Sequence, residues 1–206
     1  MSKGRIVYSR LELKFWTENV PAVEAARPSE CPGCGAASRC PGRPLTIVGH
    51  GIRERQLRGP TAVGAAAVEL VIRVRRFRCR KCGAVMMVVP PQVLRYRLFS
   101  TVAIAWALTL FGITRISSTG VRDRISPWRQ VGATAARNWQ TLGRWIAAAK
   151  AGELLPNRAL GELMPRAVAT AVAYGLSALA PPSTRAQSLA HQAVSGALHA
   201  LMGITP

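Results

Sequence analysis

The spacing of hydrophobic positions changes near the middle of the chain. Val68, Leu70, Ile72 and Val74 occupy every second position, and the residues between them become basic from Arg73 onward. This period of two is typical of a strand with one buried face. An apolar run at 85–89 follows and ends at two prolines, so we expect a β-rich domain that ends within residues 91–98.

Helical signals replace the alternation beyond this point. Ser100 is a suitable N-cap for a helix over residues 101–112, and Gly112 is a suitable stop. Ser126 followed by Pro127 is typical of a second helix start, with proline at the first helical position. Between these two signals, residues 114–126 are polar and predict about one helical turn.

A further helix is expected before residue 150. Thr141 could cap it, and the spacing then places Leu142, Trp145 and Ile146 on one face. Several short helices with tight turns favour a helix-turn-helix, in which a recognition helix enters the major groove of DNA.

The composition changes again in the last part of the chain. Residues 152–206 are rich in Ala and Leu, and the two prolines at 181–182 divide them into two expected helices. An apolar helical hairpin of this kind could serve a homodimer or a protein partner. We therefore predict an α+β fold: a small β-rich domain over 1–97, a helix-turn-helix domain over 98–150, and a C-terminal helical hairpin over 151–206.

Five cysteines carry the clearest chemistry. Cys31 and Cys34 form one CxxCG motif, and Cys79 and Cys82 form another. Two such pairs supply four thiolates for one tetrahedral ion, and the glycine permits the tight turn. Because four thiolates leave no open position, we predict one structural Zn²⁺, which makes the β-rich domain over 1–97 a zinc ribbon. Cys40 and His50 remain alternative ligands in place of one of the four thiols, and buried cysteines without metal remain the alternative to zinc.

The charge balance points to a polyanionic partner. The chain has 28 Lys and Arg against nine Asp and Glu, a formal charge of +19, and duplex DNA is the partner that this balance and the helical pattern favour. The expected contacts from the ribbon are Arg73, Arg75, Arg76, Arg78, Arg80, Lys81, Arg95 and Arg97. Those from the central domain are Arg122, Arg124, Arg129, Arg137, Asn138, Gln140, Thr141 and Arg144.

The sequence predicts no membrane association. Its most apolar stretches, 102–113 and 167–180, are shorter than the ~20 residues that a span needs, and the N-terminus lacks the apolar core of a signal peptide. We expect a cytoplasmic, nucleoid-associated protein. In a reducing compartment, cysteines are better suited to binding metal than to forming disulfides.

Four stretches resemble a known family. "CPGCG", "HGIRERQLRGP" and "VRRFRCRKCGAVMMVVPP" are similar to the N-terminal zinc-ribbon region of insertion-sequence transposases and of related bacterial zinc-ribbon proteins of unknown function. "TLGRWIAAA" resembles the helix-turn-helix that follows the ribbon in those proteins. The resemblance covers residues 30–150. It implies that Cys31, Cys34, Cys79 and Cys82 hold zinc and that the helical domain recognises DNA such as transposon ends.

The chain departs from these transposases in its acidic residues. Their nuclease domain has three metal-binding carboxylates, whereas this chain has one aspartate, Asp123, and eight scattered glutamates. Two-metal cleavage needs several converging carboxylates, so we expect a binding protein and not an enzyme. The alternatives are an RNA-binding zinc-ribbon module and a non-enzymatic scaffold of a mobile-element or defence complex.

Overall fold

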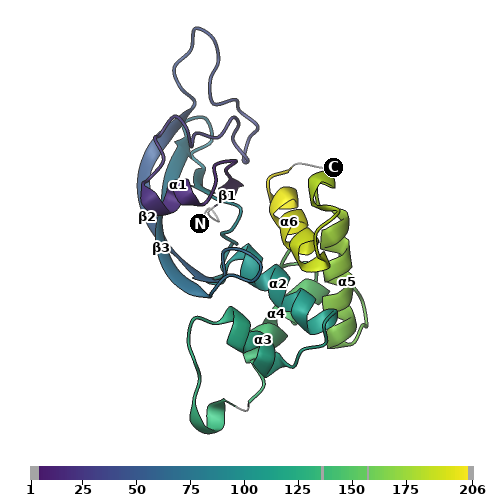
Figure 1. The fold of residues 1–206 in the computed structure, drawn as a ribbon. Helices are drawn as coiled ribbons and strands as arrows, with labels where there is room; N and C mark the ends of the chain where they lie inside the picture. The colour runs from purple at the N-terminus through teal and green to yellow at the C-terminus, as the bar shows by residue number, and fades with distance from the viewer. Residues whose placement is uncertain (1–4, 136, 157, 204–206) are drawn as a thin grey trace. The chain divides into compact units, whose positions relative to one another are not determined.

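The computed structural model describes residues 5–135, 137–156 and 158–203 (Figure 1). In these residues the fold is α+β, with one four-stranded mixed sheet and six α-helices. The chain divides into two compact units. The first comprises residues 1–57 and 70–96, and the second comprises residues 58–69 and 97–206.

The sheet has the strand order β1-β4-β3-β2. Its strands are β1 (Arg5–Tyr8), β2 (Ile47–Gly59), β3 (Val68–Cys79) and β4 (Val85–Val89). β4 pairs antiparallel with β3 and parallel with β1, so that Met86 lies between Phe77 and Arg5. The sheet therefore joins the N-terminal strand to segments about 80 residues further along the chain.

The predicted alternation in β3 is confirmed over its first half. Ile72 and Val74 are fully buried, while Val71 is exposed. The buried positions then change phase, because the next buried residues are Phe77 and Cys79. The phase change leaves both Arg75 and Arg76 half-buried.

The first unit has a continuous hydrophobic core. α1 (Lys14–Glu18) contributes Trp16, which is 2% exposed. The other buried members are Ala26, Cys31, Ile47, Leu57, Ile72, Val74, Phe77, Cys79, Ala84, Met86, Val88, Val89 and Val93. Since Cys31 and Cys79 belong to this cluster, the two cysteine motifs are built directly onto the core of the sheet.

The central helix of the second unit begins and ends as predicted. α2 spans Thr101–Gly112, and the Ser100 hydroxyl accepts a hydrogen bond from the backbone N–H of Ala103 at 2.9 Å. Nearly all of α2 is buried, because α3, α4, α5 and α6 pack around it. The same Ser100 hydroxyl donates to the carbonyl of Pro60, which ties the tip of the β2–β3 hairpin to the start of α2.

The predicted helix start at Ser126 and Pro127 is wrong. α3 spans Ser118–Ile125, and Ser126 is the residue that ends it. The Ser126 hydroxyl then accepts a hydrogen bond from the backbone N–H of Trp128, which stabilises a turn. Serine favours turns as well as helix caps, because its hydroxyl oxygen can accept a hydrogen bond from a backbone N–H in either structure.

The helix expected before residue 150 is present. α4 spans Gln140–Lys150 and buries Leu142, Trp145 and Ile146 together, as predicted. It begins one residue before the expected cap. The connection from α3 to α4 covers residues 126–139 and includes the 3₁₀ turn η1 (Gly132–Thr134). These 14 residues exceed the three or four that join the two helices of a helix-turn-helix.

The last two helices pack closely against each other. α5 spans Pro165–Ala178, α6 spans Leu189–Leu201, and η2 (Pro182–Thr184) lies at the predicted break between them. Gly196 makes this packing possible, since a Cβ there would lie 1.8 Å from the carbonyl oxygen of Leu176. A Cβ added at Gly175, on α5, would have no atom within 4 Å.

The two glycines should therefore respond in opposite ways to the same substitution. We expect Gly196→Ala to lower the free energy of unfolding by about 3 kcal/mol, because the helices must separate. Gly175→Ala should raise it by up to about 1 kcal/mol through helix propensity. Thermal and urea denaturation of the two variants measure this. Equal effects would contradict the close approach of α5 and α6.

Over the described ranges, no helix combines the length and the apolar character needed to cross a bilayer.

Candidate metal centre

Two six-residue turns with the same hydrogen bonds present the cysteines. In the first turn, CPGCGA, the backbone N–H of Cys31 donates to the carbonyl of Ala36, and the N–H of Gly35 donates to the carbonyl of Cys31, both at 2.9 Å. In the second turn, CRKCGA, residues 79, 83 and 84 repeat the two bonds at the same distance. The repetition shows that each CxxCGA segment determines its own turn.

The glycine of each turn is required by its backbone conformation and not by lack of space. Gly35 has φ +66° and Gly83 has φ +73°. A Cβ at either position would have nothing within 4 Å. A residue with a side chain would still be strained there, because only glycine adopts positive φ without steric cost.

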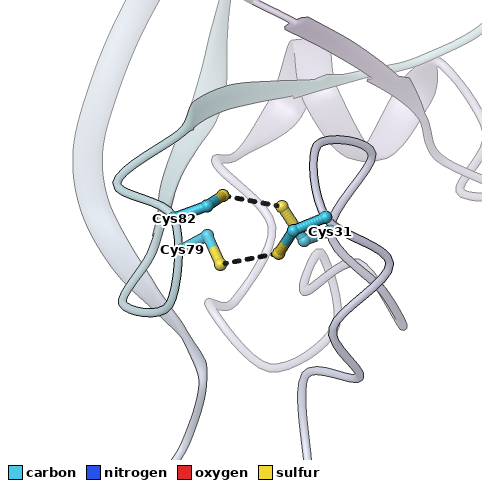
Figure 2. Close-up of side chains that lie close together, drawn as sticks. Cys31, Cys79 and Cys82 are labelled. Atoms are coloured by element: carbon cyan, nitrogen blue, oxygen red, sulfur yellow. Dashed lines mark hydrogen bonds between the residues drawn. The ribbon is translucent and has the colours of Figure 1, made fainter.

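The four sulfur atoms form one compact group (Figure 2). The Sγ atoms of Cys31 and Cys82 are 3.6 Å apart, and those of Cys34 and Cys79 are 3.8 Å apart. All four sulfurs lie within 4.8 Å of one another. A disulfide would need about 2.05 Å. A tetrahedral zinc with Zn–S bonds of ~2.3 Å places its sulfurs ~3.8 Å apart, so the spacing fits a shared ion.

This donor set fits a structural zinc. Four thiolates complete a tetrahedral shell and leave no position for water or substrate. The predicted group of Cys31, Cys34, Cys79 and Cys82 is therefore the group that the fold brings together. Cys40, which is exposed, and His50 lie outside it.

The turn backbone and the neighbouring thiols alter the pKa values of the second cysteine pair. Burial raises the pKa of Cys79, but backbone N–H groups of Cys82 and Lys81 and two neighbouring thiols outweigh it and hold the pKa at about 7. A backbone N–H lowers the pKa of Cys82, but burial and the other three thiols raise it to about 11. One thiolate forms readily, and its charge opposes the next. A divalent cation removes that opposition.

Metal affinity should consequently depend steeply on pH. Binding at pH 7 must displace the Cys82 proton and part of the Cys79 proton. We expect Zn²⁺ affinity to rise about tenfold or more per pH unit above 7, and about 100-fold or more per unit below 7, where both protons are displaced. Competition with a chromogenic chelator from pH 6 to 8 measures the slope. An affinity that does not change with pH would rule out thiolate ligation.

Most of the predicted ribbon contacts lie at the surface. Arg73, Arg78, Arg80, Lys81 and Arg95 are exposed, whereas Arg75, Arg76 and Arg97 are half-buried. Arg75 is anchored, because its Nε donates to the carbonyl of Pro21 at 2.7 Å. Of these exposed basic residues, Arg78, Arg80 and Lys81 are the nearest in sequence to the second pair of cysteines. We call these three the knuckle cations.

The predicted contacts of the central domain divide into surface and interior residues. The exposed ones are Arg124, Arg129, Arg137, Asn138, Gln140 and Arg144, and Thr141 is half-buried. Arg122 is only 3% exposed, and protein acceptors surround its guanidinium: it donates to Gln130 Oε1 at 2.9 Å and to the carbonyl of Ala135 at 2.7 Å. It holds the loop after α3 in place, so we exclude Arg122 from the expected contacts.

Sequence reasoning overlooked one exposed side chain among these cations. Tyr96 lies between Arg95 and Arg97 and is 75% exposed. The alternation of arginine and aromatic residues was the available signal, because such interleaving is typical of nucleic-acid surfaces.

The chain was also compared with protein-family models, with curated proteins and with solved structures, and none of the three comparisons gives a match.

Proposed function

We propose that this chain is a DNA-binding protein in which a zinc ribbon, stabilised by one structural Zn²⁺, presents arginines to the phosphates of duplex DNA. One observation carries the proposal. The segment from Leu70 to Tyr96 has seven basic residues and no acidic one, and it contains half of the cysteine site. Phosphate neutralisation is the common reason for such a one-signed segment.

The structure supports a rigid presentation of these charges. Arg78 is the penultimate residue of β3, and the backbone N–H of Arg80 donates to the carbonyl of Thr46 at 2.8 Å. Arg80 and Lys81 lie between the two cysteines of one turn. A bound zinc would fix that turn, so that less conformational entropy is lost when the side chains meet phosphates.

The acidic residues of the first unit do not neutralise the knuckle cations. Glu24 forms ion pairs with Arg27 and Arg39, and Glu12 pairs with Lys14. Within the described ranges, no ion pair involves Arg78, Arg80 or Lys81. A surface that served only solubility would mix the two signs.

The second unit would supply sequence selectivity. Gln140 and Arg144 are exposed, one helical turn apart on α4, and could lie on one face toward base edges. Arg129 and Arg137, in the preceding connection, would contact phosphates. This arrangement is helix-turn-helix-like in its order of helices, and the 14-residue connection distinguishes it from the tight form.

A binding role without strand cleavage agrees with the scarcity of carboxylates, since the chain has one aspartate. The resemblance of the second cysteine motif to insertion-sequence transposases is consistent with DNA recognition.

α5 and α6 bury part of their apolar surface on α2. The remaining apolar surface of these two helices could bind a second copy of the chain or a protein partner.

The test is the dependence of duplex-DNA affinity on salt. With the zinc-loaded full chain and a labelled 20-base-pair duplex, fluorescence anisotropy from 50 to 200 mM KCl should show an affinity that falls at least 100-fold, because bound phosphates release counterions. Unlabelled duplex RNA, added as competitor, should displace the DNA poorly. Affinity that does not depend on salt would refute the proposal, and stronger competition by RNA would favour the RNA-binding alternative.

A further inference from the structure

Tyr96 combines exposure with backbone strain. Its φ of 57° lies in the left-handed region, which bulky residues rarely adopt. At 75% exposure, its side chain gains little from burial. Glycine would adopt the same turn without steric cost. Beyond its contact with the neighbouring Arg95, the folded state therefore gains little from a tyrosine at this position. The exposed ring is available to a ligand.

The backbone before Tyr96 is firmly anchored. Val93 and Leu94 are buried, and the N–H of Val93 donates to the carbonyl of Pro90 at 3.0 Å. The guanidinium of Arg55 donates to the carbonyl of Leu94 at 3.3 Å. The turn thus holds the ring out from a fixed support and does not leave it on a loose tail.

Arg95 completes a stacking surface. Its guanidinium carbon lies over the Tyr96 ring, 4.7 Å from the centroid, and its Nη2 donates to the tyrosine hydroxyl at 3.0 Å. One face of the ring is thereby held against a cation. With three-quarters of the residue exposed, the other face is open to a flat ligand. A nucleobase fits such a face, and the neighbouring Arg95 would then contact the phosphate of the same nucleotide.

We propose that Tyr96 stacks on an unpaired nucleobase, so that the chain binds single-stranded as well as duplex nucleic acid. The inference rests on the proposed function and adds a substrate class to it. A duplex contact alone would not need an exposed aromatic ring, because the bases of a duplex are stacked on each other. Aromatic stacking tolerates any base, so Tyr96 should add affinity without sequence preference.

The experiment measures affinities of the zinc-loaded full chain for three probes: (dT)12, (rU)12 and a 12-base-pair DNA duplex. Tyr96→Ala and Tyr96→Gly should weaken (dT)12 binding by about 5- to 150-fold, the range expected for one lost base stack. Duplex affinity should change less than twofold. Tyr96→Phe should keep the wild-type affinity, since the ring remains. Comparison of (dT)12 with (rU)12 distinguishes single-stranded DNA from single-stranded RNA as the source of the unpaired base.

Two further readouts separate stacking from a structural role. A (dT)12 probe with 5-iodouracil should photocross-link to Tyr96, as located by mass spectrometry. Tyr96→Gly should leave the Tm unchanged or raise it by up to about 4 °C, because the strain is relieved. A lowered Tm, no cross-link at Tyr96, or an equal loss for duplex and single strand would each overturn the inference. If wild type binds none of the probes, the proposed function itself fails.

Discussion

Replacement of both Cys79 and Cys82 by serine is expected to abolish zinc binding and to unfold the sheet of the first unit at 25 °C. The two cysteines provide half of the four-sulfur group, and Cys79 is also a fully buried member of the hydrophobic core. Two remaining thiols cannot complete a tetrahedral shell, so the metal should dissociate.

The magnitude follows from the coupling of metal binding to folding. A structural zinc contributes apparent binding free energies of about 10–16 kcal/mol in small zinc domains, and this energy is available only to the folded state. A whole domain is stable by about 5–15 kcal/mol. Loss of the metal should therefore remove most of the stability of the first unit, although its core residues remain apolar.

Metal analysis and hydrogen exchange together test this expectation. Wild type should contain one zinc per chain, and the double variant none. Amides of β3 and β4 should lose protection in the variant, while those of α2 retain it, because α2 is enclosed by helices of the second unit. Cys40→Ser is the matched control, since Cys40 is exposed and lies outside the sulfur group. It should keep the metal and the wild-type protection.

Three outcomes would contradict these expectations. Zinc bound at one per chain in the double variant would mean that other residues hold it. Loss of zinc from Cys40→Ser would show that Cys40 is a ligand, as the sequence alone left open. Full protection of β3 in the metal-free double variant would show that the hydrophobic core maintains the sheet without an ion.

Neutralising the three knuckle cations should give the second large effect. We expect Arg78→Gln, Arg80→Gln and Lys81→Gln, combined, to weaken duplex-DNA binding about 100-fold or more at 0.1 M salt. Each phosphate contact contributes ~0.9 to the slope of log affinity against log salt, so the loss of three contacts should make the slope shallower by about 2–3. Since all three side chains are exposed, the fold should be unaffected.

A control of equal charge separates local contacts from net charge. Arg10, Arg115 and Arg185 are exposed and lie outside the proposed contacts, and their combined replacement by glutamine also removes three charges. Anisotropy titrations over the same salt series should show less than a threefold loss and an unchanged slope for this control. Equal effects of the two triple variants would mean that net charge alone attracts DNA and that the second cysteine motif is not a binding surface.

The strongest sequence predictions concern features that a few neighbouring residues determine. Each CxxCG motif specifies its own turn, because the spacing of the thiols and the glycine at positive φ act within five residues. The identity of the four sulfurs could therefore be predicted, although 45 residues separate Cys34 from Cys79. The Ser100 cap and the ends of α2 were predictable for the same reason, since a cap is formed by one side chain and the first turn.

Features that depend on distant segments could not be predicted in this way. β1 pairs with β4 across most of the first unit, and four residues carry too short a pattern to show it. Ser126 fitted a helix start equally well, but the preceding residues formed α3 and made Ser126 its end. Arg122 looked like the other basic residues until the loop after α3 surrounded it with acceptors.

The sequence by itself thus determined the four cysteines that form the sulfur group, the strand that leads into the second of the two motifs, the capped central helix and the excess of positive charge. The tertiary structure decided which charges remain at the surface, where β3 changes the phase of its buried positions, and that Tyr96 is held out on a strained turn. The physical reason is one of range. Turn geometry and caps depend on covalent neighbours, whereas burial and pairing depend on which distant segments occupy the remaining space.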